Sequence, residues 1–301
     1  MFEPTRFLLP VLVATAALAG CNPGAQDAKR EREACDRGDA AACNAFALRL
    51  RQGDHVLQDV ARAAELFQRA CDGGVASGCA TLGTMRLEGT GVDRDSALAA
   101  ALYQQGCDAG AAAGCTSLGI LFRDGDSLTA NPARAAVLFE RACNGSDLEG
   151  CSDLGALYVA GEGVPPDPAH AVQLFRKACD GDLPEGCVGL GKLYADGAGV
   201  VQDVDSAAAL FKQACDADNA AGCFRLGRAY ATGQGMEQDF KQAADLYQRA
   251  CRRRHAEACY RLGILYQDGT GVDRVPVRAA IYVGRACDYG YTEACPRKEG
   301  S

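Results

Sequence analysis

CDGDLPEGCVGLGKLYADGAGVVQDVDSAAALFKQA, the stretch from Cys179 to Ala214, is a 36-residue template that recurs along the chain without insertion or deletion. The other complete copies begin at Cys35, Cys71, Cys107, Cys143, Cys215 and Cys251, and the first third recurs at Cys287. A fixed period of this length is typical of stacked units, in which each unit packs only against its neighbours. The sequence therefore predicts one continuous array and no second domain.

Each copy carries two apolar stripes, which predict two helices. In the copy from Cys179 the first stripe is Cys187, Leu190, Gly191 and Tyr194, and the second is Ala207, Leu210, Phe211 and Ala214. Both stripes have the i, i+3, i+4, i+7 spacing of one helix face. After a lead-in helix that ends near Cys35, the pattern predicts the helix pairs 40–52/59–72, 76–88/95–108, 112–124/131–144, 148–160/167–180, 184–196/203–216, 220–232/239–252 and 256–268/275–288.

Turn residues mark the ends of these helices. A glycine follows each first helix, where the chain takes a left-handed conformation that glycine tolerates. Six residues later an Asp or Asn is the expected N-cap of the second helix, except at Val275, where Pro276 occupies the first turn. The caps are Asp59, Asp95, Asn131, Asp167, Asp203 and Asp239. A GxG such as Gly89–Gly91 lies in the loop, but no strand precedes it, so we do not interpret it as a phosphate site.

Residues 1–20 predict an export signal, because Arg6 precedes an apolar run that is too short to span a bilayer. The run ends in LAGC at Cys21, which resembles the lipobox of bacterial lipoproteins and implies that Cys21 is lipidated. Ordinary signal cleavage beside an incidental cysteine is the alternative. Asn22 is not the Asp that favours inner-membrane retention in that family.

These features divide the chain into four segments. They are a lipoprotein signal peptide (1–20), a lipidated tether with a lead-in helix (21–34), the repeat array (35–296) and a tail (297–301). The expected location is the bacterial cell envelope, at the outer membrane or facing the periplasm.

The 17 cysteines of an exported chain point to disulfides. All except Cys21 fall into Cys-x7-Cys pairs, and two regular pairings fit the helices. A separation of eight joins Cys71 to Cys79, whereas a separation of 28 joins Cys43 to Cys71 and leaves Cys35 and Cys295 without partners. We predict the first, and we exclude a metal site because CxxC spacing is absent. The predicted bridges are Cys35–Cys43, Cys71–Cys79, Cys107–Cys115, Cys143–Cys151, Cys179–Cys187, Cys215–Cys223, Cys251–Cys259 and Cys287–Cys295.

The repeated columns resemble the cysteine-rich branch of the Sel-one-like repeat proteins over essentially all of residues 35–296. The motif is Cys-x7-Cys-x2-Leu-Gly-x2-Tyr-x2-Gly-x-Gly-Val, followed by Asp-x3-Ala-Ala-x-Leu-Phe-x2-Ala-Cys. The resemblance implies an all-α, right-handed α/α superhelical solenoid, similar to tetratricopeptide arrays, with about seven 36-residue helix pairs, regular disulfides and a concave surface lined by the first helices. Some secreted members are classed as β-lactamases or penicillin-binding proteins, and most members are adaptors.

No catalytic, cofactor or metal site is predicted from the residues. No serine has Lys three positions later, as serine β-lactamases require, and the Ser-Asp-Asn and Lys-Thr-Gly elements are absent. His55, His170 and His255 fall in different repeats without HExxH spacing, so we interpret them as solvent-exposed loop or helix-end residues.

Charge suggests a binding surface. The net charge of −8 argues against nucleic-acid binding, but the copy from Cys251 carries +4, from seven arginines against Glu257, Asp268 and Asp273. Aromatic residues and arginines off the apolar stripe are typical of binding hot spots, although a solvated face with incidental arginines is an equal alternative. The candidate partner-binding residues are Phe224, Arg225, Arg228, Tyr260 and Arg261, with Phe224 expected beside Tyr260 and Arg225 beside Arg261.

We therefore expect a lipid-anchored envelope scaffold that binds a peptide or protein partner, acidic or derived from the cell wall, in its concave groove. This function needs no catalysis, cofactor or nucleic acid. By resemblance alone, the alternative is a penicillin-binding protein or a β-lactamase. A nitrocefin hydrolysis assay on the purified, oxidised protein distinguishes the two hypotheses.

Overall fold

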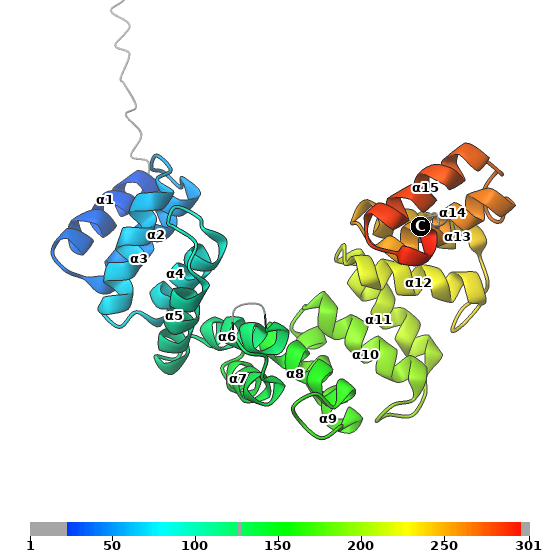
Figure 1. Ribbon diagram of the computed structural model, residues 1–301, viewed down its shortest axis with the longest axis horizontal. Helices are drawn as coiled ribbons and strands as arrows, with labels where there is room; N and C mark the ends of the chain where they lie inside the picture. Colours follow the sequence, from blue (N-terminus) through cyan, green and yellow to red (C-terminus); the bar gives the residue numbers. More distant parts are fainter. Residues whose placement is uncertain (1–22, 126–127, 296–301) are drawn as a thin grey trace, which may run out of the picture.

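The computed structural model describes residues 23–125 and 128–295, and this part of the chain contains helices but no strand. A leading helix, α1 (Pro23–Asp36), precedes seven helix pairs (Figure 1). The first helices of the pairs are α2 (Ala40–Gln52), α4 (Ala76–Glu88), α6 (Ala112–Asp124), α8 (Leu148–Ala160), α10 (Pro184–Asp196), α12 (Ala220–Thr232) and α14 (Ala256–Asp268). The second helices are α3 (Val60–Asp72), α5 (Ser96–Asp108), α7 (Pro132–Asn144), α9 (Pro168–Asp180), α11 (Val204–Asp216), α13 (Phe240–Arg252) and α15 (Pro276–Asp288), and a 3-10 turn, η1 (Thr292–Ala294), follows.

The all-α repeat fold and its helix boundaries are as predicted. Each expected Asp or Asn cap of a second helix accepts a hydrogen bond from a backbone N–H two or three residues later, and Val275 has no side-chain cap. The lead-in segment differs from the prediction, because α1 is helical from Pro23 onward and leaves almost no tether within residues 21–34. The signal peptide (1–20), Cys21 and the tail (297–301) lie outside the described residues.

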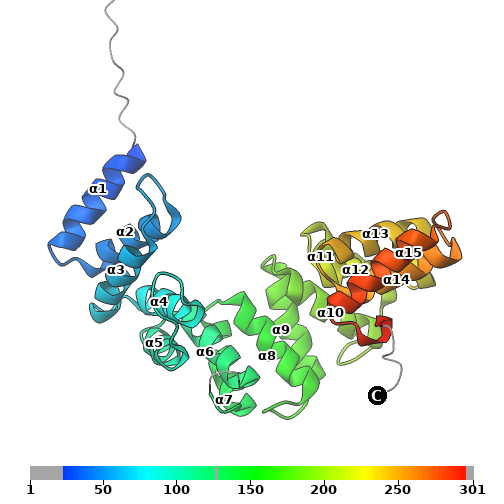
Figure 2. The ribbon, with the colours of Figure 1, turned by 45° about the horizontal axis from the view of Figure 1, so that its top comes forward.

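The helices follow one another around an open arc, with α1 at one end and α15 at the other (Figures 1 and 2). From α4 to α12, consecutive first helices touch each other, for example α4 with α6 and α10 with α12, more extensively than consecutive second helices do. Helices on the inner side of a curved stack lie closer together than those on the outer side. The first helices therefore form the inner layer of the arc.

A glycine in the first helix allows the two helices to pack closely in five of the seven pairs, whereas α2 has the buried Ala47 at this position and Gly263 of α14 faces Val283. Gly119 on α6 faces the ring of Phe139 on α7, and a Cβ at Gly119 would lie 2.5 Å from that ring. Phe139 is fully buried, so its ring cannot move into solvent. The same pairing recurs in other copies, with a Cβ at the glycine lying 2.7–3.2 Å from the ring: Gly83 with Tyr103, Gly155 with Phe175, Gly191 with Phe211 and Gly227 with Tyr247.

The second glycine of each GxG loop also has a steric role. Gly163 has φ of +73°, and a Cβ there would lie 2.2 Å from the backbone of Pro132, at the start of α7 in the preceding repeat. Gly199 makes the same approach to Pro168, at 2.3 Å. The loops therefore lie against the N-terminus of the preceding second helix, and this contact explains the GxG pattern.

The eight predicted disulfides are all present at a separation of eight residues, with Cα–Cα distances of 4.4–4.8 Å. Seven of them join the end of one helix to the first turn of the next first helix, as Cys71 of α3 is joined to Cys79 of α4, and Cys287–Cys295 joins α15 to the residue after η1. Closing so short a loop stabilises the fold by about 2–3 kcal/mol in the chain-entropy estimate. Disulfides of this number place the chain in an oxidising compartment outside the cytoplasm.

Basic side chains add a second connection between repeats. Lys177 on α9 donates from Nζ to the carbonyl oxygen of Cys143 on α7, at 2.7 Å. Arg69 and Arg249 donate in the same way to the carbonyls of Cys35 and Cys215. A cation at a helix C-terminus satisfies carbonyls that have no partner within the helix and interacts favourably with the helix dipole. Neighbouring second helices are thus connected although they curve apart.

We expect Gly119→Ala to destabilise the protein by about 1–3 kcal/mol, because the added methyl group collides with the buried Phe139 ring. Gly284→Ala is the matched control, since Gly284 lies in helix α15 and a Cβ there would meet no atom within 4 Å. At that position the helix propensity of Ala is expected to stabilise the protein by up to about 1 kcal/mol. Urea unfolding of both variants provides the measurement, and equal effects would contradict the role of Gly119.

Candidate partner-binding site

The predicted patch on α12 and α14 is only partly a surface. Phe224 is 4 % exposed and belongs to the core, so its assignment as a surface binding residue is wrong. Its ring stacks on His255 with a centroid separation of 4.4 Å and lies 5.9 Å from the ring of Tyr247. Phe224 is therefore needed to pack the two repeats together.

Two further residues of the patch are engaged within the last repeat. Tyr260 packs against Tyr291, with ring centroids 5.0 Å apart. Arg261 forms an ion pair with Glu257, one turn earlier on α14, with an N–O distance of 3.0 Å. Arg225 and Arg261 do not line a common hollow, so the expected single patch of five residues is divided.

Arg225 and Arg228 on α12 differ from the other three. Among the described residues, neither guanidinium has a hydrogen-bond acceptor or an ion-pair partner within range. Arg225 is half-buried, whereas Arg228 is exposed. Burial, together with the neighbouring charge of Arg228, lowers the pKa of Arg225 from its ordinary value. Two adjacent cations repel each other, and although Asp196 and Glu257 attract Arg225, neither forms an ion pair with it, so a bound anion would be stabilised here.

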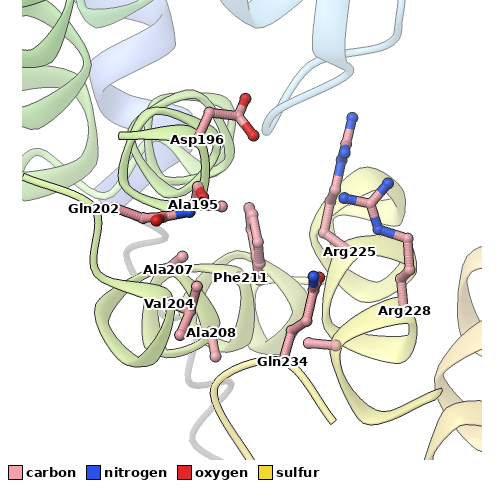
Figure 3. Close-up of a pocket in the computed structure, with 11 residues that line it drawn as sticks. Ala195, Asp196, Gln202, Val204, Ala207, Ala208, Phe211, Arg225, Arg228 and Gln234 are labelled. Atoms are coloured by element: carbon pink, nitrogen blue, oxygen red, sulfur yellow. Dashed lines mark hydrogen bonds between the residues drawn. The ribbon is translucent and has the colours of Figure 1, made fainter. Parts of the chain in front are cut away.

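Both arginines line a hollow of about 180 Å³ between two repeats. In Figure 3, Arg225 and Arg228 form one wall, Asp196 at the end of α10 forms the opposite wall, and Phe211 of α11 rises between them. The floor is apolar, and Gln202 and Gln234 come from the loops that close the rim. The remaining lining residues are Ala195, Val204, Ala207, Ala208 and Ala229.

A second hollow, of about 360 Å³, lies on the other side of Arg228. Arg261 reaches it from α14, and Ile264, Leu265 and Tyr247 provide apolar surface. Burial raises the pKa of Tyr247 to about 12, so this phenol stays neutral at ordinary pH. Arg228 therefore separates two hollows that are each part basic and part apolar.

The preceding repeats carry the opposite charge. Glu149, Asp153 and Glu185 line a hollow of about 260 Å³ on α8 and α10. Burial, together with repulsion from neighbouring carboxylates, raises the pKa values of Glu149 and Asp153, although Arg123 donates to Asp153 at 2.7 Å. The inner layer thus changes from acidic to basic between α8 and α12.

The histidines do not form a site. His170 packs edge-on against Tyr158, at 4.7 Å, and His55 lies in the loop before α3. His255 lies at a helix end, as expected, but it is half-buried: it is the N-cap of α14, and its Nδ1 accepts from the N–H of Ala258 at 3.2 Å. Within residues 23–125 and 128–295, no group of three or more His, Cys, Asp or Glu side chains could hold a metal ion.

Comparison with family profiles identifies the repeats. The Sel1 repeat profile matches residues 40–75, 76–110, 112–147, 148–183, 184–219, 220–255 and 256–291. The chain belongs to the Sel1 repeat family. Each matched Sel1 unit begins at a first helix and ends just before the next one, so the helix pair and the inter-repeat turn make up one unit.

Solved structures share the Sel1 fold. A protective antigen of uropathogenic Escherichia coli that displays an SLR fold has a TM-score of 0.72 and 24% identity, over 89% of this chain and 57% of that chain. A Sel1 repeat protein from Oxalobacter formigenes has a TM-score of 0.75 and 18% identity, over 86% of this chain and 98% of that chain. This Sel1 chain thus spans little more than half of the Escherichia coli protein. A comparison with curated proteins gives no match.

Sel1 arrays are repeat scaffolds, and such scaffolds typically mediate protein interactions through an extended curved surface. The described part of this Sel1 chain has no helix with the length and apolarity needed to cross a membrane. The lining residues Asp196, Phe211, Gln202 and Gln234 were not predicted, because they carry no distinctive motif and most of them belong to the preceding Sel1 unit.

The His255 cap predicts a pH-dependent stability. Burial lowers the pKa of His255, so the unfolded chain takes up a proton first as the pH falls. The stabilisation is complete above about pH 6.5 and declines as the pH falls toward the folded-state pKa. Asn219 caps the preceding first helix in the same column without titrating. In thermal unfolding, we expect the melting temperature of wild type to fall more than that of His255→Asn when the pH is lowered from about 7 to 5. Equal changes in the two proteins would contradict the role of the His255 cap.

Proposed function

We propose that the protein is a lipid-anchored scaffold of the bacterial envelope that binds a protein or peptide partner on the inner face of its arc, without catalysis. The observation that carries this proposal is the pair Arg225 and Arg228 on an inner helix, two cations that have no ion-pair partner among the described residues; both line one part-apolar hollow, and Arg228 also lines a second. Unpaired arginines next to apolar surface are the composition at which binding energy concentrates in interfaces.

The rigidity of the array supports the same function. The disulfides Cys179–Cys187 and Cys215–Cys223 fix the junctions on both sides of the α10–α11 pair, and α11 forms the floor of the first hollow. A surface that is already ordered loses little conformational entropy when a partner binds. The basic face is therefore suited to a partner that presents carboxylates.

The anchor is proposed from the sequence. Cys21 is the one cysteine without a partner in the Cys-x7-Cys grid, and it ends a lipobox-like run. Lipidation there would hold the array at a membrane surface, and the disulfides are consistent with export.

Affinity capture from envelope extracts tests partner binding. We expect Arg225→Gln/Arg228→Gln to lose the captured proteins, and the difference from wild type to be largest at low salt, because salt screens exposed charge interactions. Arg37→Gln/Arg252→Gln is the matched control, since it removes the same charge from two exposed arginines, one just after α1 and one at the end of α13. Equal capture by both double variants would contradict binding at this face.

Substitution of the lipobox cysteine tests the anchor. Cys21→Ser is expected to abolish incorporation of labelled fatty acid, because the variant lacks the proposed lipidated residue. It is also expected to leave the membrane fraction, because stable anchoring needs several acyl chains. A variant that is still labelled and sediments with membranes would show that Cys21 is not the lipidated residue.

A further inference from the structure

We infer that the hollow between α10, α11 and α12 is a subsite for the carboxyl terminus of a peptide whose last residue is aliphatic, an inference that rests on the proposed function. The hollow has three different walls (Figure 3): Arg225 and Arg228 on one side, Asp196 on the other, and an apolar floor of Phe211 and neighbouring alanines. A ligand that satisfies all three must carry an anion, a hydrogen-bond donor and an apolar group close together.

The last residue of a peptide has this combination on one Cα. Its carboxylate would accept from Arg225 and Arg228, whose guanidinium groups have no acceptor of their own among the described residues. Its side chain would lie on Phe211 and the alanines, and its backbone N–H would donate toward Asp196. Each wall of the hollow then contacts a group of complementary chemistry.

An internal acidic residue fits less well. Its carboxylate is the tip of its side chain, so it brings no separate apolar group to the floor formed by Val204, Ala207 and Ala208. The floor would stay hydrated and contribute nothing to binding. The hollow is also enclosed by three helices and by the loops of Gln202 and Gln234, an arrangement that accommodates a chain end more readily than a passing strand.

The position of Asp196 adds selectivity for a peptide over a simple carboxylate. Attraction to Asp196 partly opposes the lowering of the Arg225 pKa that burial causes, yet Asp196 forms no ion pair with that residue. A bound carboxylate would avoid this side of the hollow because like charges repel, and a donor would be drawn to it. The two walls thus orient the terminal residue in one direction.

The experiment uses two hexapeptide pools randomised at every position, one with free carboxyl termini and one amidated. Immobilised full-length, oxidised protein is expected to retain the free-acid pool at least about tenfold more than the amidated pool, since charge-assisted hydrogen bonds to one terminus account for such a factor. Sequencing of the retained free-acid peptides is expected to show enrichment of Ala, Val or Leu at the last position.

Two double variants assign the effect to this hollow. Arg225→Gln/Arg228→Gln is expected to reduce the ratio of free-acid to amidated peptide to about one, with circular dichroism confirming the fold, while Arg37→Gln/Arg252→Gln keeps the ratio. Equal retention of both pools, no retention of either, or enrichment of internal Asp or Glu would overturn the inference. If capture of an envelope partner still depends on Arg225 and Arg228 in that case, the proposed function survives and only the carboxyl-terminal subsite fails.

Discussion

In the five units from α4–α5 to α12–α13, the close contact between a first-helix glycine and a second-helix aromatic ring is the constraint on which the packing of the helix pair depends. Where Gly119 meets Phe139, no side chain other than hydrogen fits without displacing a fully buried ring. This contact sets the separation of the two helices in a unit, and the second GxG glycine sets the approach of successive units. Disulfides, and basic side chains that donate to helix C-terminal carbonyls, then connect neighbouring units at this separation. A constant separation is consistent with a 36-residue period that recurs without insertion.

The architecture could be predicted from the sequence because each residue type with a structural role occurs at an equivalent position in successive repeats. Glycines, N-caps and cysteines repeat at a fixed spacing, and their physical roles do not depend on distant residues. The candidate site could not be predicted in the same way. Phe224 lies off the stripe that packs within its own unit, yet it is buried by His255 of the next unit. Equivalent residues Ala80 and Thr116 are also buried, so this column belongs to the junction between units in those copies as well.

The charge pattern explains why the basic residues remain available. Several arginines and lysines elsewhere in the described chain are used structurally: Arg49 pairs with Glu31 and holds α1 against α2, and Lys177 caps α7. Arg261 has Glu257 on its own helix. At Arg225 and Arg228 the described part of the array supplies no such partner, although the overall charge is −8. A pair of arginines that forms no ion pair within the described residues, although Asp196 lies across the hollow, is suited to binding an anionic group from outside.

The availability of these two arginines can be measured directly by recording the Nε–Hε resonances of arginine side chains while acetate is added. Acetate is expected to shift the signals of Arg225 and Arg228 at lower concentration than those of Arg49, Arg123 and Arg261, whose guanidinium groups already have carboxylate partners. If the Arg225 and Arg228 signals do not respond, or if all five respond alike, the inner face of α12 is not an anion-binding surface.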